Sequence, residues 1–379
     1  MERTQISHLN MPVPLLDLRA QHASIRDDIE RAIKSVVDAQ TFILGETVER
    51  FETNVAALSN VRHAIGCASG TDAILLALRA LDVGRGDEVV TTPFTFFATA
   101  GTIHNVGATP VFADIDPDTF NLHSGAAAAA ANARTKAVIP VDLFGQMAPL
   151  EELAALLPGM PIVEDAAQSI GARRKIGESW VMAGERARIG TFSFYPSKNL
   201  GAYGDGGMMV TQDDSLATRL RKLRVHGGAK QYHHEEVGYN SRLDSLQAAV
   251  LQAKLPYLAS WSEARRRHAE YYDAALADVS GIRTPIIDQL NECIFNQYTI
   301  RAERRDQLQD FLRKREIGCY VYYPLPLHLQ PCFAYLGHKP CAFPESERAA
   351  REVLSLPVYP ELTTDQMDQT IDAVREFYG

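Results

Sequence analysis

The stretch Thr191-Phe-Ser-Phe-Tyr-Pro-Ser-Lys198-Asn-Leu-Gly-Ala-Tyr-Gly-Asp-Gly-Gly207 begins with aromatic and β-branched residues, as a strand does, and then turns into a glycine-rich run. One lysine, Lys198, lies at its centre. Desolvation in such surroundings favours the neutral amine, which can attack a carbonyl and hold a Schiff base. The glycines allow the backbone to approach a bulky planar group. The plainer alternative is a surface turn whose lysine points into water, and the rest of the chain decides between the two.

A second stretch, Ala64-Ile-Gly-Cys67, has the composition of a short buried strand and leads into Ala68-Ser-Gly-Thr-Asp72 and an apolar helix over 73–81. Small and hydroxyl residues, Gly70 and Thr71 among them, therefore open a helix. Its free N–H groups and positive dipole end suit an anion such as phosphate. The alternative is that Ser69 or Thr71 only caps the helix, which is the commoner use of such residues.

Strands and helices then alternate along the chain. Short strands are expected over 88–91, 109–114, 137–143, 161–164 and 207–211, with helices between the first four. Such alternation predicts an α/β fold with a parallel sheet covered by helices on both faces. Ligands of such sheets bind at the carboxyl ends of the strands.

Two groups of residues fall at predicted strand ends. The run Pro161-Ile-Val-Glu-Asp165 is apolar until its two acids, and an acid at that place can pair with a buried cationic nitrogen. A helix cap or a local salt bridge is the alternative. Phe94, Phe96 and Phe97 crowd another strand end, and at least one of them is expected to pack in the core.

The C-terminal part changes character. Leu243 to about Leu276 is expected to form one long helix that leads to a second domain. Strands over 295–300 and 319–323 and helices over 307–315, 346–354 and 364–377 predict a small α+β domain. We therefore expect a large α/β domain over residues 1–250, with a helical lead-in, and a smaller domain over 251–379. The run Tyr322-Tyr-Pro-Leu-Pro-Leu-His328 reaches a ligand or packs between domains.

Composition narrows the function classes. The 379 residues are 46% hydrophobic and 22% charged, with a net charge of −9 and no long basic run. A nucleic-acid partner is not expected from this charge. No apolar run approaches the roughly 20 residues of a membrane helix. The N-terminus lacks a signal-peptide pattern, so we expect a cytoplasmic protein without a membrane partner.

Cysteines and histidines give no metal signature. Five cysteines are scattered without CxxC spacing, which favours reduced, packed thiols. His226, His233 and His234 are close in sequence, but their spacing matches no zinc or iron site. No metal is expected.

Together, a Schiff-base lysine, a strand-end acid, an aromatic ring and a phosphate-binding helix start describe a pyridoxal 5′-phosphate site. The lysine would carry the aldehyde and the acid would keep the pyridine nitrogen protonated, which makes the ring an electron sink. The aromatic ring would stack on the cofactor.

The motifs that carry this site resemble the sugar aminotransferases of the DegT/DnrJ/EryC1/StrS family, within the aspartate-aminotransferase fold type. They are Ala68-Ser-Gly-Thr-Asp-Ala73, Thr92-Pro-Phe-Thr-Phe96, Glu164-Asp-Ala-Ala-Gln168, Ser193-Phe-Tyr-Pro-Ser-Lys198 and Asn240-Ser-Arg-Leu-Asp244. The resemblance covers almost the whole chain. It implies a mostly parallel sheet of seven-stranded type between helices, and the smaller C-terminal domain.

The resemblance also implies roles for single residues. Lys198 is the Schiff-base lysine and moves protons, and Asp165 pairs with the pyridine nitrogen. Gln168 lies by the ring hydroxyl, and Phe96 stacks on the ring. The phosphate is held by Gly70, Thr71 and Ser193.

Further residues are implied at the substrate and at a subunit boundary. Asn240 reaches the phosphate of the neighbouring subunit, which implies a homodimer with shared sites. Arg242, Tyr322 and His328 are expected to contact substrate. The family moves an amino group from glutamate to a keto sugar linked to UDP or dTDP, in amino-sugar biosynthesis for lipopolysaccharide or glycosylated metabolites.

The segment Gly238-Tyr-Asn-Ser-Arg-Leu-Asp-Ser-Leu-Gln-Ala-Ala resembles members that aminate carbon 3 more than those that act on carbon 4. A UDP-linked 2-acetamido-3-keto-hexuluronic acid and a dTDP-linked 3-keto-6-deoxy sugar both remain open, because Arg242 suits either. A carbon-4 enzyme and a non-catalytic regulatory relative also remain open. A lyase or desulfurase would need its own reactive group, and no cysteine lies in an evident catalytic loop.

Overall fold

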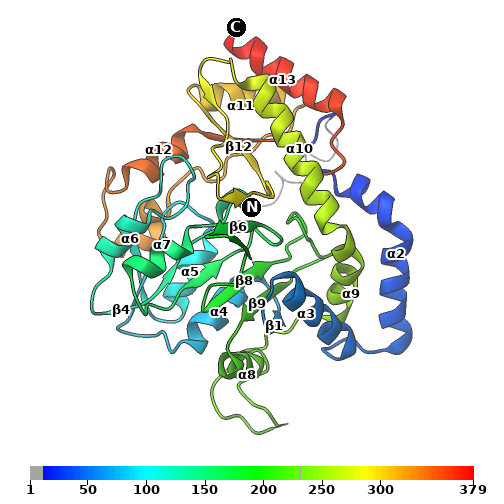
Figure 1. Ribbon diagram of the computed structural model, residues 1–379, viewed down its shortest axis with the longest axis vertical. Coiled ribbons are helices and arrows are strands. Elements are labelled where there is room, and N and C mark those ends of the chain that lie inside the picture. Colours follow the sequence, from blue (N-terminus) through cyan, green and yellow to red (C-terminus); the bar gives the residue numbers. More distant parts are fainter. Residues whose placement is uncertain (1–11, 231) are drawn as a thin grey trace.

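The computed structural model describes residues 12–230 and 232–379. Its centre is a mixed sheet with the strand order β1-β9-β8-β5-β4-β2-β3, in which bridges between residues 138 and 162 and between 141 and 165 join β4 to β5 (Figure 1). The strands are β1 (His63–Cys67), β2 (Glu88–Thr91), β3 (Thr109–Phe112), β4 (Thr135–Ile139), β5 (Val163–Asp165), β8 (Ile189–Ser193) and β9 (Gly207–Thr211). β9 runs antiparallel to both neighbours, and the order β8-β5-β4-β2-β3 is parallel. The seven-stranded, mostly parallel sheet is confirmed.

Helices cover both faces of this sheet. One face packs on α4 (Gly70–Ala80), α5 (Ala98–Asn105) and α8 (Asp214–Leu223). The other packs on α3 (Glu46–Leu58), α6 (Ser124–Ala130), α7 (Leu150–Leu156) and α9 (Ser245–Lys254). Successive strand residues point to opposite faces, so Met209 joins the first core while Met208 and Val210 join the second. Burial on both faces explains why the strands read as continuous apolar runs.

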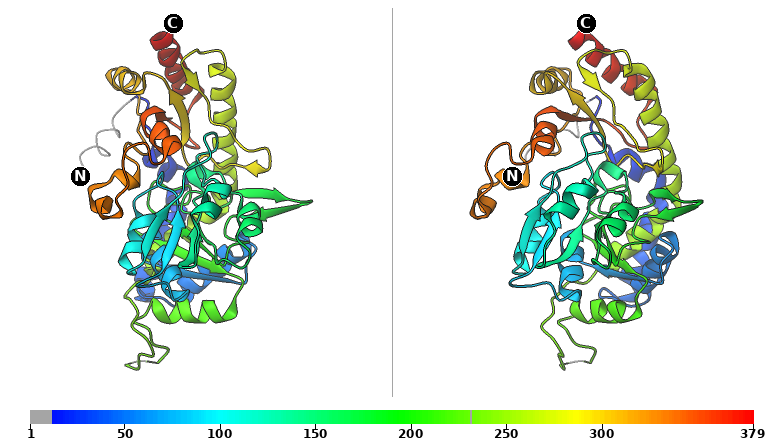
Figure 2. Two further views of the ribbon diagram at one scale, coloured as in Figure 1. Left: turned by 90° about the vertical axis from the view of Figure 1, so that its left-hand side faces the viewer. Right: turned by 60° about the vertical axis from the view of Figure 1, so that its left-hand side comes forward.

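A separate group of elements lies beyond one end of the sheet (Figure 2). The strands β10 (Ile282–Arg283), β12 (Tyr298–Ala302) and β13 (Val353–Leu356) form one sheet, packed by α10 (Leu258–Leu276), α11 (Arg305–Lys314) and α13 (Thr364–Tyr378). α12 (Pro344–Glu352) precedes β13. The predicted domain boundary between residues 250 and 251 falls inside α9, and the division into two domains stays a prediction.

The predicted long helix over 243–276 is two helices. α9 ends at Lys254, a 3-10 turn (η3, Leu255–Tyr257) follows, and α10 then rises along the C-terminal elements (Figure 1). Pro256 explains the break, because proline lacks an N–H group and its ring clashes with the carbonyl four residues earlier. α10 still connects the two sets of elements, as expected.

Two further expectations for the C-terminal part were wrong. The helix expected over 346–354 ends at Glu352, and residues 353–356 form β13, which pairs antiparallel with β12. Residues 319–323 form no regular strand, and only Tyr320 bridges to Ser355. The sequence also gave no sign of the hairpin β6 (Arg173–Ile176) and β7 (Ser179–Met182), which extends from the body and pairs with β11 (Asn291–Glu292) (Figure 2).

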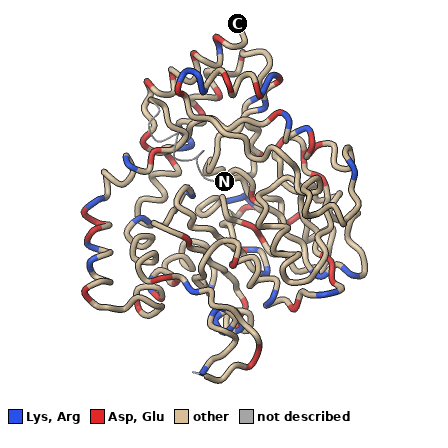
Figure 3. Tube along the Cα trace, turned by 180° about the vertical axis from the view of Figure 1, so that it is seen from behind, with Lys and Arg blue, Asp and Glu red and all other residues tan. Residues whose placement is uncertain are grey.

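The N-terminal helix α2 (Leu18–Ala39) packs against α9, with Asp17 accepting from the N–H groups of Arg19 and Ala20 at its start. Its charged residues alternate in sign along the exposed face (Figure 3), as in the Lys34–Asp38 ion pair. The segments 226–230 and 232–240 project beyond α8, away from the sheet, and are called the projecting loop below (Figure 1). Within the described residues, no helix is long and apolar enough to cross a membrane.

Candidate active site

The start of α4 packs directly on the end of β8. A Cβ placed on Gly70 would lie 2.6 Å from the Cβ of Ser193, so only glycine allows this approach. Ser69 caps the helix, since its hydroxyl accepts from the N–H of Asp72 at 3.1 Å. The capping role therefore belongs to Ser69. The backbone of Gly70, exposed Thr71 and the hydroxyl of Ser193 remain together at the positive end of an 11-residue helix, where an anion is stabilised.

The lysine loop begins where β8 ends. The N–H groups of Phe194 and Ala202 bind the carbonyls of Gly206 and Phe194, both at 2.8 Å, which closes the loop on itself. Lys198 is half-buried at its tip, with its N–H on the carbonyl of Tyr195. Burial lowers the pKa of the Lys198 amine to about 8, although the charge of Asp165 opposes that shift. A substantial fraction of this amine is therefore neutral near physiological pH, as a nucleophile must be.

Asp165 lies at the carboxyl end of β5, next to β8 in the sheet. It is buried, and its carboxylate accepts from the hydroxyl of Thr99 at 2.8 Å and from the N–H of Ala167 at 3.3 Å. Burial raises the pKa of this carboxyl group, while the Thr99 hydrogen bond and the charge of Lys198 lower it. Because a cation nearby favours the ionised form, a protonated ring nitrogen is a fitting partner for Asp165.

Gln168 and Phe96 are joined by Tyr323, to which the sequence analysis gave no role of its own. The side chain of Gln168 accepts from the N–H of Phe144 at 2.6 Å and donates to the hydroxyl of Tyr323 at 3.3 Å. The ring of Tyr323 in turn lies 6.2 Å, centroid to centroid, from that of Phe96. Phe96 is 57% exposed and so accessible for stacking, whereas Phe94 is buried, which meets the expectation that at least one of the three rings packs in the core.

The predicted substrate residues differ in their placement. Tyr322 is half-buried and packs on Tyr320 with a centroid distance of 4.8 Å. His328 is only 2% exposed, and its Nε2 atom pairs with a carboxylate oxygen of Glu347 at 3.1 Å. The structure does not bring His328 to an open surface, which disfavours direct contact with a substrate.

Asn240 and Arg242 lie at the base of the projecting loop. Ser241 between them donates to the carboxylate of Asp72 at 2.7 Å, which holds this segment beside the start of α4. Asn240 is exposed and Arg242 half-buried. Neither side chain has a hydrogen-bond partner within residues 12–230 and 232–379.

Sequence reasoning missed Thr99, and it included Tyr323 only as part of the run 322–328, without a role of its own. Thr99 lies in the first turn of α5, two residues after the Phe96-Phe97 pair, so a hydroxyl beside the aromatic motif was the available signal. Tyr323 is adjacent to the predicted Tyr322, and strand-like alternation could not show which ring faces the site.

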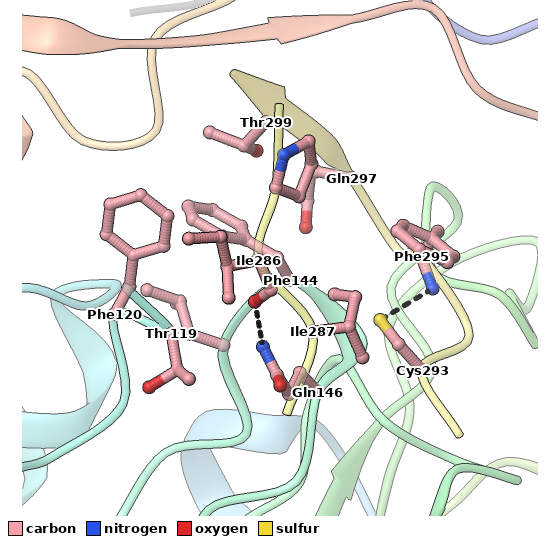
Figure 4. A pocket seen from close by; sticks show the side chains of 12 residues that line it. Thr119, Phe120, Phe144, Gln146, Ile286, Ile287, Cys293, Phe295, Gln297 and Thr299 are labelled. Carbon is pink, nitrogen blue, oxygen red and sulfur yellow. Dashed lines mark hydrogen bonds between the residues drawn. The ribbon is translucent and has the colours of Figure 1, made fainter. Parts of the chain in front are cut away.

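The cysteines offer no reactive thiol beside the lysine loop. Cys293 lines a small hollow together with Phe144 and Phe295, and its sulfur accepts from the N–H of Phe295 at 3.3 Å (Figure 4). Burial raises the pKa of the Cys293 and Cys319 thiols to about 12 and also raises that of Cys67. Thiolate nucleophiles need a lowered pKa, so these three are structural. None of these three cysteines therefore supports the desulfurase alternative, which needs a reactive thiol.

A family model for the DegT/DnrJ/EryC1/StrS aminotransferases matches residues 23–375. The chain belongs to this family. Two relatives illustrate its range. A "pleiotropic regulatory protein" of Geobacillus stearothermophilus is 50% identical over 97% of this chain and 99% of its own length. A UDP-N-acetyl-3-dehydro-α-D-glucosamine 3-aminotransferase of Acidithiobacillus ferrooxidans is 44% identical over 97% and 98%.

Among solved structures, the chain is similar to DesV of S. venezuelae in complex with a ketimine intermediate. The TM-score is 0.94 at 41% identity, covering 97% of this chain and 98% of DesV. The fold is therefore that of the pyridoxal-phosphate-dependent sugar aminotransferases, and the predicted family, fold and enzyme class are confirmed.

Pyridoxal 5′-phosphate is the cofactor of this aminotransferase, and the described residues fit it. Gly70 leaves room where a Cβ would clash with Ser193, the start of α4 presents free N–H groups, and the Lys198 amine has a lowered pKa beside a buried carboxylate. The start of α4 suits the phosphate, the Lys198 amine suits the aldehyde, and the buried carboxylate suits the pyridine nitrogen.

Proposed function

We propose that this aminotransferase moves an amino group from L-glutamate to carbon 3 of a keto sugar linked to UDP or dTDP. The observation that carries the chemistry is the placement of the Lys198 amine, in the loop after β8, near the Asp165 carboxylate at the end of the neighbouring parallel strand β5. Burial lowers the pKa of Lys198, the charge of Asp165 raises it, and the charge of Lys198 in turn lowers the pKa of Asp165. A lysine of this kind exchanges amines with a carbonyl.

Bound pyridoxal phosphate supplies a carbonyl for amine exchange and a ring that withdraws electrons from the reacting carbon. Lys198 would hold the cofactor and, once released, move a proton at its Nζ atom between the two reacting carbons. Asp165 would hold the ring nitrogen in its protonated form, with Thr99 keeping the carboxylate in place at 2.8 Å. Gly70, Thr71 and Ser193 would bind the phosphate, and Gln168 would face the ring hydroxyl.

Carbon 3 is supported by the relatives. The protein from A. ferrooxidans is named a 3-aminotransferase of a UDP sugar, and a Pseudomonas aeruginosa relative with 42% identity is named an aminotransferase of a UDP-linked 3-oxo-glucuronate. A Streptomyces venezuelae relative with the same identity is named for a dTDP-3-amino sugar. Both nucleotides therefore stay within the proposal, and Arg242, with Tyr322 as a further candidate, is proposed to contact the sugar.

We further propose that the active enzyme is a cytoplasmic homodimer with shared sites and serves amino-sugar biosynthesis, for example of lipopolysaccharide. The exposed Asn240 and the half-buried Arg242 lie on a segment next to the phosphate-binding end of α4, with a projecting loop before them. Side chains at that place can reach a second subunit. The proposal also keeps the two-domain division near α9.

Two alternatives remain within the family. A carbon-4 aminotransferase would use the same Lys198 and Asp165. A regulatory role is favoured by one specific observation, the name of the 50% identical G. stearothermophilus relative. Against it stands the intact set of Lys198, Asp165 and the α4 start, which a protein without catalysis has no need to keep.

One experiment tests the proposal. The purified protein is incubated with glutamate and a panel of UDP- and dTDP-linked 3-keto and 4-keto sugars, and the formation of 2-oxoglutarate is followed. We expect turnover with at least one 3-keto sugar. Turnover restricted to 4-keto sugars would overturn the carbon-3 assignment, and loss of visible cofactor absorbance on adding glutamate separates a catalytic protein from a regulator.

A further inference from the structure

Two carboxyl groups outside the cofactor site are buried side by side behind Asp165. Glu164, in β5, and Asp142, after β4, are both 0% exposed, and the two carboxyl groups lie close enough for each to shift the pKa of the other. Neither forms a salt bridge within the part of the chain that the structure describes. If both neighbouring carboxyl groups were ionised without a cation, they would repel each other strongly in the low-polarity interior of the protein.

The hydrogen bonds around the pair show where a proton is needed. One oxygen of Asp142 accepts from the N–H of Ala148 at 2.8 Å, and the other accepts from the hydroxyl of Ser169 at 2.7 Å. One oxygen of Glu164, Oε2, accepts from the N–H of Gly184 at 2.9 Å. The remaining oxygen, Oε1, is buried and has no donor among the described residues. It is satisfied if it carries a proton and donates it to Asp142.

We propose that Glu164 is a protonated carboxylic acid that donates to an ionised Asp142, and that this pair is a positioning element for Asp165. The pair is tied to Asp165 through the backbone, since the N–H of Asp142 binds the carbonyl of Asp165 at 3.0 Å. Side chains of successive strand residues point to opposite faces, so Glu164 and Asp142 support β5 from behind. The positioning role rests on the proposed function of Asp165, whereas the protonation of Glu164 is independent of that function.

The shared proton also has an electrostatic consequence. It reduces the buried charge of Glu164 and Asp142 from two to one, so Asp165 stays ionised more easily. Burial, and next the charge of Asp142, raise the pKa of Glu164 well above its usual value, and burial raises that of Asp142 to about 6. Within the described residues, the charged groups that face this cluster are Asp142, Asp165 and, on the far side of Asp165, Lys198.

Three full-length variants test the proton. Glu164→Gln replaces the protonated acid by a neutral amide that still donates to Asp142. Asp142→Asn removes the remaining charge. Glu152→Gln, on the exposed side of α7, is the matched control. Infrared spectra of the holoenzyme at neutral pH should show the carbonyl band of a protonated carboxylic acid in the wild type and in Glu152→Gln, and lose it in Glu164→Gln.

The pH dependence of thermal unfolding gives a second measurement. Because the pKa of Glu164 is raised in the folded state, its contribution to stability is complete below the unfolded pKa, about 4.3, and is lost as pH rises through the folded pKa. The Tm of the wild type relative to Glu164→Gln should therefore fall as the pH is raised from about 5. An unchanged infrared band in Glu164→Gln, or equal pH dependence of the two proteins, would overturn the protonated acid.

The positioning role has its own readout. Asp142→Asn removes a negative charge near Asp165 and should move the acid limb of the kcat–pH profile to lower pH, by roughly one unit or less. Glu164→Gln, which keeps that charge, should leave the limb in place. If both variants leave it in place, the pair does not act on Asp165. These outcomes differ from failure of the proposed function, in which the wild type itself shows no turnover.

Discussion

Lys198 is the residue on which the proposed chemistry depends. Lys198→Ala should abolish both transamination and the visible absorbance of the lysine-bound cofactor, and Lys198→Arg should do the same because a guanidinium stays protonated and forms no imine. Absorbance spectra and the 2-oxoglutarate assay measure the two effects. Lys254→Arg is a useful control, since Lys254 is a second buried lysine that donates to the carbonyl of Gly201 at 2.7 Å. Turnover like that of the wild type in Lys198→Ala would disprove the assignment.

The lowered pKa of Lys198 predicts how the protein recaptures its cofactor. Burial stabilises the neutral amine, with a pKa of about 8, and only that form attacks the aldehyde. After the cofactor is removed, the rate of reconstitution should rise about tenfold per pH unit below this value and level off above it. Stopped-flow absorbance measures this rate. A profile that keeps rising toward the ordinary lysine pKa would show that Lys198 is not desolvated in the free protein.

Asp165 is expected to act on the electronics of the ring. Asp165→Asn should lower turnover by a factor of 100 or more, roughly, while reducing cofactor occupancy far less, because the asparagine cannot stabilise a protonated ring nitrogen. Occupancy is measured by absorbance after alkaline release, and turnover with saturating substrates. If the asparagine variant keeps a nearly normal rate, Asp165 is only a structural acid held by Thr99.

The site residues differ in how far the sequence could reveal them. Asp165 stands out because it ends an apolar predicted strand, and Lys198 because it is the lysine at the centre of a stretch of hydroxyl, aromatic and glycine residues. Thr99 and Tyr323 do not, since their partners Asp165 and Gln168 are 66 and 155 residues away along the chain. Such contacts depend on the tertiary fold, which a local pattern does not contain.

Among the secondary-structure elements, the contact between α4 and the strands β8 and β9 sets the phosphate end of the site. A Cβ on Gly207 would lie 2.2 Å from the backbone oxygen of Ser69, whereas one on Gly84 would lie 3.8 Å from its nearest neighbour. Gly207→Ala should therefore lower the free energy of unfolding by about 1–3 kcal/mol, because backbone cannot yield as a side chain does. Gly84→Ala is the control and should change stability little.

Chemical denaturation measures the difference in stability between Gly207→Ala and Gly84→Ala, provided that the m-value is the same for both. Cofactor affinity should fall in Gly207→Ala as well, because the start of α4 is displaced from Ser193. A Gly207→Ala protein as stable as Gly84→Ala would show that the α4 start shifts freely and does not define the site.

Elements were predictable where composition and position agree. The strands over 88–91 and 207–211 have the predicted bounds, since turn residues enclose short apolar runs. β13 was missed because Val353-Leu-Ser-Leu356 follows α12 without a turn residue, and only pairing with β12 makes it a strand. Pro256 was visible in the sequence, and its break in the long helix could have been expected.

At the scale of the whole molecule, alternation of strands and helices is enough to predict the layered sheet, because each face must be covered by apolar helices. The order of the strands is not local information. β9 follows the lysine loop in sequence and inserts antiparallel between β1 and β8, which brings the start of α4 onto the end of β8. The alternation predicted a parallel sheet, and the resemblance to the family predicted its seven-stranded type.

The last prediction concerns the second subunit. We propose that each site takes Lys198 from one chain and Asn240 and Arg242 from the other. Lys198→Ala subunits have an intact Asn240–Arg242 segment, and Arg242→Ala subunits have an intact lysine. A heterodimer of the two would contain one native site and one doubly altered site, so refolding the two inactive variants together should restore activity to about half that of the wild type per heterodimer.

Differently tagged subunits allow the heterodimer to be isolated before its activity is measured. The opposite outcome would follow if Arg242 served the site of its own chain, where the hydrogen bond between Ser241 and Asp72 holds the segment beside the start of α4. In that case the two substitutions fall in different sites of the heterodimer. Each site then carries one defect, and the heterodimer stays inactive. Inactive heterodimers of two individually inactive variants would therefore place Arg242 in the same site as the Lys198 of its own chain, and the dimer would assemble without sharing catalytic groups.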